Sequence, residues 1–301
     1  MEYAVKIYSR IGELMQGFLP DASSFLVSGL PSRLFFSEAI LQTGGDLQGP
    51  RGGDLHSPLD LHSSRAEPRA SPGAAALPPK ARQALDIFLR TCAKNIAGCS
   101  IRLRSNIPPG KGLSSSSTDI LSVLHVVNDH LQTGCSPEHL YRIAASVEPT
   151  DPCLSNDIVV FRQQVGFVDR CITLPPMTVL YFDAESGRQI DTMDVQRCWT
   201  MGGGKFFEWL LRRFIQAAEK GDYKTLFECI TYSAEYNQTV IALPRFAEYY
   251  QLAQQTQSGL MVAHSGTIVG LLTPPDRAAE LLGRLQTSTT IYSEQYIPYL
   301  F

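Results

Sequence analysis

Hydrophobic and polar residues alternate near the start of the chain in the pattern typical of strands. Tyr3–Tyr8 alternates with period two, and Phe25–Ser28 and Leu34–Leu41 are further strand candidates. Between them, Ser9–Gly17 combines glycine, serine and charged side chains, which predicts a turn. We therefore expect short strands separated by turns at this end of the chain.

A change of composition follows these strands. Residues Thr43–Lys80 are crowded with Gly, Pro, Ser, Ala and charged side chains, and they include few large apolar residues. Such a segment cannot bury much apolar surface. We therefore predict a mobile insertion or long surface loop over residues 43–80.

Helical periodicity appears after the insertion and alternates with further strand patterns. The stripe Ile120, Leu124, Val127 and Leu131 predicts a helix over Ser116–Leu131. Ser136, followed by Pro137, predicts the N-cap and first position of another helix. Other predicted helices are Ala81–Cys92, Phe206–Ala218, Tyr223–Ala234, Arg245–Gln255 and Asp276–Leu285, and predicted strands are Ser100–Ser105, Ile158–Phe161, Gly166–Asp169, Thr178–Phe182, Gly259–His264, Thr267–Leu272 and Thr290–Tyr292. This mixture predicts an α+β sandwich.

Composition and charge limit the kinds of molecule that this chain is expected to bind. The 301 residues are enough for two domains, and 44% hydrophobic with 18% charged residues is typical of a packed core. A net charge of −3 argues against a nucleic-acid surface, and no apolar run is long enough to cross a membrane. Seven cysteines without C-x-x-C spacing, and an N-terminus without a secretory pattern, predict reduced thiols and a cytoplasmic location. A small-molecule substrate is the expected partner, and a homodimer stays open.

A glycine- and serine-rich segment lies between a predicted strand and a predicted helix. Pro108–Asp119 reads PPGKGLSSSSTD. Glycines let the backbone approach an anion closely, serines donate hydrogen bonds, and the helix N-terminus offers free N–H groups to phosphate. The segment is neither a Walker A loop nor G-x-G-x-x-G. We predict a phosphate-binding loop; the alternative is a linker ahead of a helix.

Three other polar segments are candidates for chemistry. Gly12–Gly17 reads GELMQG, Ser146–Asp151 reads SVEPTD, and His264–Thr267 reads HSGT between two predicted strands. Each also has a structural interpretation: turn residues in the first, a helix end and turn in the second, and a buried core histidine in the third.

Taken together, these segments resemble the GHMP kinase superfamily, which includes galactokinase, homoserine kinase and mevalonate kinase. Pro108–Thr118 resembles the P-x-x-x-G-L-x-S-S-x motif of that family, Gly12–Gly17 its first motif, and His264–Thr267 its third, glycine-rich motif. The combination with Lys111 and SVEPTD is most similar to the bacterial L-threonine kinases, which serve cobalamin side-chain synthesis. Two features depart from the family pattern: the 43–80 insertion and Ser114, where most members have glycine.

This resemblance implies a two-domain α+β fold. The first domain, over residues 1–172, would be similar to ribosomal protein S5 domain 2, and the second, over 173–301, would be ferredoxin-like. ATP would lie in the cleft between the halves.

It also implies roles for single residues. Ser116 and Glu148 would hold Mg²⁺, a hard cation that prefers oxygen ligands. Asp151 would face the accepting hydroxyl, although Asp157 is near enough to compete for that role. Lys111 would assist catalysis by neutralising phosphate charge, although a loop lysine is often only solvated. The residues expected to bind ATP are Pro108, Pro109, Gly110, Lys111, Gly112, Leu113, Ser114, Ser115, Ser116 and Ser117.

The expected reaction is transfer of the γ-phosphoryl group of ATP to the hydroxyl of a small amino acid, with L-threonine preferred. Glu13, Gln16, His264, Ser265, Gly266 and Thr267 are the expected substrate contacts, with Glu13 a candidate for the ammonium group. L-serine, homoserine and sugars stay open as acceptors. A catalytically silent nucleotide- or metabolite-binding relative, and an insertion that docks a partner protein, are the rival hypotheses.

Overall fold

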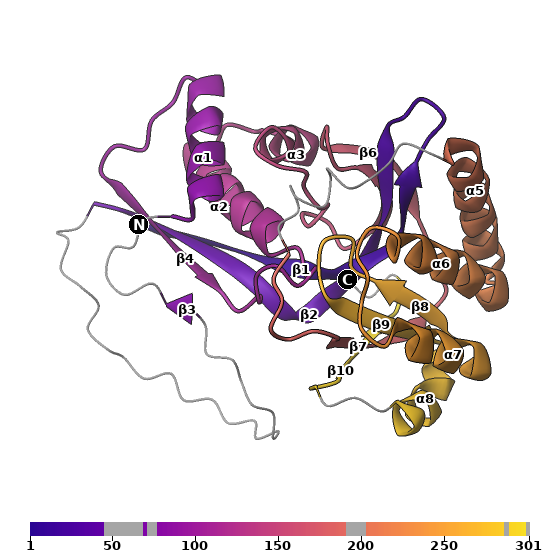
Figure 1. The fold of residues 1–301 in the computed structure, drawn as a ribbon. Helices are drawn as coiled ribbons and strands as arrows, with labels where there is room; N and C mark the ends of the chain where they lie inside the picture. The colour runs from indigo at the N-terminus through magenta and orange to yellow at the C-terminus, as the bar shows by residue number, and fades with distance from the viewer. Residues whose placement is uncertain (45–68, 71–76, 191–202, 286–288, 299–301) are drawn as a thin grey trace.

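The structure is a computed structural model that describes residues 1–44, 69–70, 77–190, 203–285 and 289–298. The predicted α+β class is confirmed, because helices alternate with strands along the chain and ten described strands form one sheet (Figure 1). The strand order along the main path is β10-β7-β9-β8-β1-β2-β4-β3, and β5 and β6 extend the sheet from β2. The strands are β1 (Glu2–Phe18), β2 (Ser24–Thr43), β3 (Arg69–Ala70), β4 (Cys99–Ser105), β5 (Ile158–Arg162), β6 (Phe167–Ile172), β7 (Met177–Asp183), β8 (Gly259–Val262), β9 (Ile268–Thr273) and β10 (Tyr292–Tyr296).

Strand β1 shows that the turn predicted over Ser9–Gly17 was wrong. It runs through Ser9–Gly17, where we predicted a turn, and pairs antiparallel with β2 along most of its length. The strand bends instead of ending, with register shifts between Tyr8 and Arg10 and between Glu13 and Met15. Polar residues can lie inside a strand when distant parts of the chain bond to them, as they do here to Arg10 and to the side-chain NH₂ of Gln16. Strand β2 likewise joins the two separate strands predicted for it into one.

Three helices cover one face of the sheet in the first half of the chain: α1 (Pro79–Thr91), α2 (Ser115–Leu131) and α3 (Pro137–Ala145) (Figure 1). The predicted cap of α3 is confirmed, because the Ser136 hydroxyl accepts a hydrogen bond from the His139 N–H. Helix α1 begins at Pro79, inside the segment predicted as an insertion, because proline is tolerated in a first helical turn. Most of that segment, 45–68 and 71–76, lies outside the described residues.

The second half contributes four described α-helices and a short 3₁₀ helix. They are α5 (Gly204–Lys220), α6 (Tyr223–Asn237), α7 (Phe246–Thr256), η1 (Pro275–Arg277) and α8 (Ala278–Arg284). Strand β7 is buried on both faces: Val179 and Tyr181 belong to one core cluster, and Leu180 and Phe182 to another. Since successive side chains of a strand point to opposite faces, layers pack on both sides of β7.

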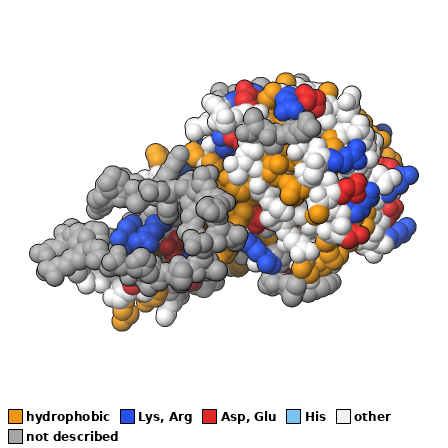
Figure 2. Space-filling view, turned by 90° about the horizontal axis from the view of Figure 1, so that it is seen from below, with side chains coloured by type: hydrophobic (Ala, Val, Ile, Leu, Met, Phe, Trp, Pro, Cys, Tyr) orange, Lys and Arg blue, Asp and Glu red, His pale blue; other side chains and the backbone are white. Residues whose placement is uncertain are grey.

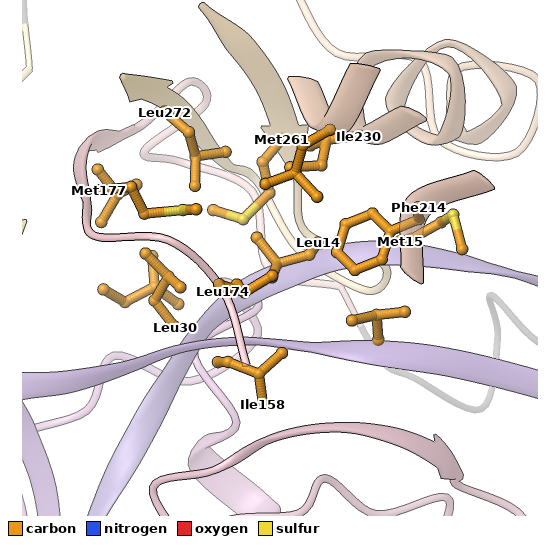
Figure 3. Close-up of a cluster of buried hydrophobic side chains, with 14 of the residues drawn as sticks. Leu14, Met15, Leu30, Ile158, Leu174, Met177, Phe214, Ile230, Met261 and Leu272 are labelled. Carbon is orange, nitrogen blue, oxygen red and sulfur yellow. The ribbon is translucent and has the colours of Figure 1, made fainter. Parts of the chain in front are cut away.

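The largest core cluster joins the two halves of the chain. Leu14 from β1 and Leu30 from β2 pack in it with Met177 from β7, Met261 from β8 and Phe214 from α5 (Figure 3). The division at 172/173 stays a prediction, and this cluster and the sheet both run across it. The long β1–β2 pair therefore provides a common support for elements from both halves.

The face displayed in Figure 2 carries interspersed acidic and basic side chains. Among the described residues, none of the helices has both the length and the apolar character needed to span a membrane.

Candidate active site

The predicted phosphate-binding loop connects β4 to the N-terminus of α2. Gly110, Gly112 and Ser114 have φ angles of +68°, +82° and +55°, so every second residue lies in the left-handed region. Such alternation turns successive backbone N–H groups toward a common anion-sized concavity, and the free N–H groups of the first turn of α2 continue it. Ser114 occupies a conformation that favours glycine, which gives a physical reason for the glycine that most of the superfamily has there.

All ten residues expected to contact ATP lie in this one segment, but their side chains differ in exposure. Leu113 belongs to the central core cluster, and Ser117 is also buried. Pro108, Pro109, Gly110, Gly112, Ser114, Ser115 and Ser116 are partly exposed. The partly exposed residues and the backbone are therefore the part of the loop that a nucleotide can reach.

The structure brings the first and third motifs to this loop. The Gly12 N–H donates to the Gly112 oxygen at 3.1 Å, and the Thr267 N–H donates to the Lys111 oxygen at 3.1 Å. The Glu13 carboxylate accepts a hydrogen bond of 2.6 Å from the His264 N–H. Three segments that are far apart in the sequence thus meet through direct hydrogen bonds.

Two glycines, Gly112 and Gly266, allow the loop and the third motif to approach each other closely. A Cβ atom built on Gly112 would lie 2.0 Å from the Cβ atom of Ala263, and one built on Gly266 would lie 2.1 Å from the Lys111 carbonyl group. Real Cβ atoms do not approach other atoms that closely. Gly112 and Gly266 therefore let the loop and the third motif pack closely against one another.

The Gly112→Ala variant is expected to lose stability for two reasons. The alanine would be held at positive φ, and its Cβ would clash with Ala263. Gly134 offers a matched control, because it has a φ of +66° but a Cβ added to it would meet no atom within 4 Å. We expect Gly134→Ala to lower the free energy of unfolding by about 1–2 kcal/mol and Gly112→Ala to lower it by more, measured by urea denaturation. Equal losses would contradict the close packing of the three motifs.

Two carboxylates lie beside the first turn of α2. Glu148 accepts hydrogen bonds from the Ser116 hydroxyl and, at 2.6 Å, from the Lys80 ammonium group. The main-chain N–H of Asp151 donates to the Ser117 hydroxyl at 2.9 Å, and that hydroxyl lies 3.4 Å from the Asp151 carboxylate. The predicted metal pair, Ser116 and Glu148, is therefore in direct contact, and Asp151 is held next to it.

Burial makes the charges in this region unfavourable. It raises the pKa of Asp151 above its ordinary value, and the charge of Glu148 raises it further; hydrogen bonds from Ser114 and Ser117 oppose the rise. Burial likewise raises the pKa of Glu13 well above its usual range, and the charge of Asp151 adds to the effect. Clustered, partly desolvated carboxylates favour a bound cation, which would relieve their repulsion.

His264 contributes little charge to this region. Burial lowers the pKa of its imidazole to about 4, so the ring is neutral at pH 7. His264 therefore brings hydrogen-bonding capacity rather than a positive charge, and its backbone N–H is the group that holds Glu13.

The oxygen ligands at this place fit Mg²⁺. Magnesium is usually bound by one or two carboxylates together with substrate phosphates and water, and the Ser116 hydroxyl, Glu148 and nearby Asp151 provide hard oxygen atoms beside the loop. In the part of the chain that the structure describes, no group of three or more His, Cys, Asp or Glu side chains could hold a metal ion. A site with so few protein ligands depends on the bound phosphates to complete it.

Asp157 is less well placed than Asp151. Its side chain is exposed and accepts a hydrogen bond of 2.5 Å from the Ser155 hydroxyl. Its backbone oxygen is a partner of Arg10. This geometry favours Asp151 over Asp157 for contact with a bound substrate.

Lys111 has contacts that its expected role in catalysis did not include, and that role stays a prediction. The residue is only 7% exposed, and its ammonium group forms an ion pair of 2.7 Å with Asp183. It also donates to the backbone oxygens of Glu185, Ser186 and Arg188 at 3.0, 2.9 and 2.6 Å. An ammonium group has three N–H donors, and these oxygens already occupy them. Lys111 is therefore not a free cation for phosphate in this structure.

Gln16 lies in a buried network instead of at an open surface. Its side-chain NH₂ donates to Asn237 at 2.9 Å, and its backbone N–H donates to the Ser233 hydroxyl at 2.9 Å. Asn237 donates in turn to the Ala263 oxygen at 3.2 Å, next to the third motif. The side-chain oxygen of Gln16 is buried and has no hydrogen-bond partner among the residues that the structure describes, and the role of Gln16 as a substrate contact stays a prediction.

Arg10 is a residue of this region that sequence reasoning missed. Arg10 is 2% exposed. Its guanidinium group donates hydrogen bonds to backbone oxygens of β2 and of the segment after Asp151. Those oxygens belong to Gly29, Pro152, Ser155 and Asp157. Arg10 thereby fixes the backbone that carries Asp151, and its charge opposes the rise in the pKa of Asp151. Arg10 lies in Ser9–Gly17, the segment predicted as a turn, so the local sequence pattern gave no sign of its burial.

Family models and known proteins match large parts of this chain. The N-terminal domain model of the GHMP kinases matches residues 80–157, and the C-terminal domain model matches residues 214–288, together just over half of the chain. The chain is 28% identical to an L-threonine kinase of Salmonella typhimurium over 62% of this chain and 64% of that enzyme. It is 27% identical to a 4-diphosphocytidyl-2-C-methyl-D-erythritol kinase of Pelotomaculum thermopropionicum over 65% of this chain and 68% of that enzyme. The match thus spans less than two thirds of the length of the Salmonella enzyme.

Solved structures agree on the fold. The phosphomevalonate kinase of Streptococcus pneumoniae superposes with a TM-score of 0.67 at 12% identity, covering 98% of this chain and all of that chain. The mevalonate kinase of Methanococcus jannaschii superposes with a TM-score of 0.65 at 13% identity, covering 97% and 98%. Both domain models, the convergence of the three motifs and these superpositions lead to one conclusion: the chain belongs to the GHMP kinase family.

Proposed function

We propose that this protein is an ATP-dependent kinase that phosphorylates the hydroxyl of a small amino acid, with L-threonine as the first choice. The observation that carries the proposal is the position of Asp151 and Glu148 beside the first turn of α2, where the phosphate loop ends. An alcohol kinase needs a phosphate-binding backbone, a metal-binding oxygen pair and a group that faces the hydroxyl. In this proposal the loop backbone would provide the first, Ser116 with Glu148 the second, and Asp151 the third.

The backbone of the loop would bind and orient the phosphates of ATP. Left-handed residues Gly110, Gly112 and Ser114 set the direction of its N–H groups, and the positive end of the α2 dipole faces the same region. Phosphoryl transfer depends mainly on positioning and on charge stabilisation, so a preorganised loop of this kind is a suitable framework.

Asp151 would act on the acceptor. In the transfer, the acceptor oxygen forms a bond to the γ-phosphorus, the bond from that phosphorus to the β–γ bridging oxygen breaks, and ADP leaves. The hydroxyl proton passes to the Asp151 carboxylate. The raised pKa of Asp151 makes it a better proton acceptor than an exposed aspartate.

Ser116 and Glu148 would hold Mg²⁺. A bound Mg²⁺ would neutralise phosphate charge during the transfer. Glu148 pairs with Lys80 and Ser116 in the present structure, so these contacts keep the carboxylate oriented toward the start of α2.

An amino-acid acceptor agrees with the acidic character of the site. Its ammonium group would be stabilised by the Glu13 carboxylate, since a nearby positive charge would offset the burial and the Asp151 charge that raise the pKa of Glu13. Its carboxylate would be held by N–H groups of the turn that contains Ser265, Gly266 and Thr267. The names of two relatives support the same acceptor. The L-threonine kinase of Salmonella typhimurium is 28% identical to this chain, and an L-threonine kinase of Citrobacter freundii is 27% identical.

Other alcohols are the competing acceptors, because the P. thermopropionicum relative carries the name of a kinase for a different alcohol. A panel of L-threonine, L-serine, homoserine and simple sugars, assayed for ADP release with Mg²⁺ and ATP, would separate them. We expect L-threonine to give the highest kcat/KM. Nucleotide binding without turnover on any acceptor would instead support the silent relative.

The Glu13→Gln variant tests how the acceptor is recognised. Because a hydrogen bond to a charged group contributes about 1.5–3 kcal/mol, we expect the KM for L-threonine to rise about 10- to 150-fold. The KM for ATP should stay within about twofold, since the phosphates bind through the loop. Steady-state kinetics with each substrate varied in turn would measure both values.

Two controls make this result specific. Glu38→Gln changes a carboxylate of β2 that lies opposite Lys6 and Arg104 in the sheet, and should leave both KM values unchanged. The second control is 3-hydroxybutanoate, which lacks the ammonium group of threonine and should be phosphorylated equally poorly by the wild type and by Glu13→Gln. An unchanged KM for L-threonine in Glu13→Gln would remove Glu13 from the acceptor pocket.

A further inference from the structure

The side chain of Lys111 leaves the phosphate loop and enters the second half of the protein. Its ammonium group meets the Asp183 carboxylate at the end of β7 and three backbone oxygens of residues 185–188. The family motif gave no reason to expect these contacts, since all four oxygen partners lie about 70 residues or more further along the chain.

Asp183 is shared between Lys111 and the third motif. One of its carboxylate oxygens pairs with Lys111, and the other accepts hydrogen bonds from the Thr267 hydroxyl at 2.5 Å and the Glu185 N–H at 3.1 Å. The Ala184 N–H also donates to the Thr267 oxygen at 2.9 Å. One carboxylate thus connects the loop, the segment after β7 and the turn of the third motif.

The backbone of the loop, like the Lys111 side chain, forms hydrogen bonds with the second half of the protein. The Lys111 oxygen accepts from the N–H groups of Thr267 and Ile268, both at 3.1 Å, and the Gly110 oxygen accepts from the Ile190 N–H at 3.1 Å. Gly110 and Gly112, the neighbours of Lys111, have positive φ angles. Lys111 is therefore the centre of the curved part of the loop, and it is fixed through both its backbone and its side chain.

The contact between Lys111 and Asp183 places two charged groups where they are poorly hydrated. Lys111 is 7% exposed, and the Asp183 side chain is 23% exposed. Removing a lysine from water is unfavourable unless its hydration is replaced, and here one carboxylate and three carbonyl oxygens replace it. Loss of either charge would leave the other poorly compensated, so both residues should be needed for the same geometry.

We propose that Lys111 and Asp183 form an anchor that sets the position and curvature of the phosphate loop relative to the second half of the protein. Lys111 is then a positioning residue that acts through the loop backbone and does not contact phosphate. The inference rests on the proposed function in one respect: the loop that Lys111 and Asp183 position is taken to bind ATP.

A double-mutant cycle distinguishes the anchor from a direct phosphate contact. The variants are Lys111→Met, Asp183→Asn and their combination, and the first readout is the Kd for a non-hydrolysable ATP analogue. If Lys111 anchors the loop, each single variant should raise that Kd by about tenfold or more, and the double variant should be no worse than the weaker-binding single variant. If Lys111 contacts phosphate, Asp183→Asn should leave the Kd within about twofold of wild type while Lys111→Met raises it.

A kinetic readout separates positioning from general loss of structure. The KM for ATP should rise with the Kd in both single variants. In Lys111→Met, which leaves the contact between Asp183 and Thr267 in place, the KM for the acceptor should change by less than about twofold. Arg213→Met provides the control, because it removes an ion pair of 3.0 Å between α5 and α6 and should change neither constant. Equal increases in both KM values for Lys111→Met would overturn the proposal.

The anchor can also be tested without turnover. Urea denaturation of the four proteins in the cycle gives a coupling energy between Lys111 and Asp183, and the anchor requires that their effects are clearly non-additive. Additive effects on the free energy of unfolding would contradict it. This readout stays valid even if the wild type phosphorylates no acceptor in the panel, so failure of the proposed function and failure of the anchor are distinguishable.

If Lys111→Met does not fold, Lys111→Arg replaces it in the cycle. A planar guanidinium group cannot reproduce the contacts of an ammonium group with three carbonyls and a carboxylate, so the anchor predicts a Kd about tenfold higher than wild type. Wild-type affinity in Lys111→Arg would show that any cation suffices, as a phosphate contact allows.

Discussion

The Asp151→Asn variant is expected to lower kcat for the preferred acceptor by about 100- to 10,000-fold, the range over which general base groups contribute. Asparagine has nearly the same shape and can accept a hydrogen bond from Ser117, as Asp151 does. It cannot take a proton from the acceptor hydroxyl. Since binding does not require that proton transfer, the KM for ATP should change little, and the defect should lie in kcat.

The matched control for this variant is Asp157→Asn. Asp157 lies on the same connecting segment, but its side chain is exposed and bound to Ser155. We expect kcat of Asp157→Asn to stay within about twofold of wild type, as for an ordinary surface substitution. Similar losses in both variants would mean that the segment as a whole, and not the Asp151 carboxylate, is required.

The pH dependence of kcat/KM gives a second readout for Asp151. The base form of a carboxyl group is lost as the pH falls through its pKa, and burial together with Glu148 raises the pKa of Asp151. The acidic limb of the wild-type profile should therefore begin at a higher pH than for an exposed aspartate. That limb should disappear in the residual activity of Asp151→Asn.

The Glu148→Gln variant should have the second largest effect. Glu148 is expected to supply the carboxylate ligand of Mg²⁺, and metal stabilisation of phosphate charge contributes several kcal/mol to such reactions. We expect kcat/KM to fall about 100-fold or more and the Mg²⁺ concentration for half-maximal activity to rise. Titration of activity with Mg²⁺ at fixed ATP would measure both changes.

Two further variants make the interpretation of Glu148 specific. Ser116→Ala removes the hydroxyl that donates to Glu148 and should raise the Mg²⁺ requirement in the same direction, by less than Glu148→Gln does. Glu138→Gln changes a carboxylate in the first turn of α3 and should leave the Mg²⁺ requirement unchanged. A loss of activity in Glu148→Gln with an unchanged Mg²⁺ requirement would contradict the role of Glu148 as a ligand.

The parts of the fold that follow local rules could be predicted from the sequence. The apolar stripe of α2, the Ser136 cap of α3 and the glycine-rich loop each depend on residues within a few positions of one another. The motif segments at Glu13 and His264 could also be identified, and the structure joins them by a direct hydrogen bond.

The parts that depend on distant partners could not be predicted. Ser9–Gly17 has the composition of a turn, but Arg10 donates to backbone oxygens more than 140 residues away, and the side-chain NH₂ of Gln16 donates to Asn237 of α6. These contacts allow polar residues to be buried in a continuous strand. The composition of a segment shows that it has polar groups to satisfy, but does not show where their partners are.

Lys111 illustrates the same limit within the site. A lysine in a phosphate loop suggests a phosphate contact when only the local sequence is considered. Its partners, Asp183 and the three carbonyls that follow, lie in a segment without a recognisable motif. Only the fold places that segment against the loop, and this contact is the reason why we propose positioning instead of catalysis for the side chain.

The central claim, that this protein transfers a phosphoryl group from ATP to a hydroxy amino acid through Asp151, is tested most directly by identifying the product. Wild type and Asp151→Asn would be incubated with ATP, Mg²⁺ and L-threonine, and the mixture analysed by mass spectrometry for O-phospho-L-threonine. The account predicts that O-phospho-L-threonine and ADP accumulate in equal amounts with wild type and that both nearly vanish with Asp151→Asn. ADP formation without a phosphorylated acceptor, or undiminished product with Asp151→Asn, would contradict it.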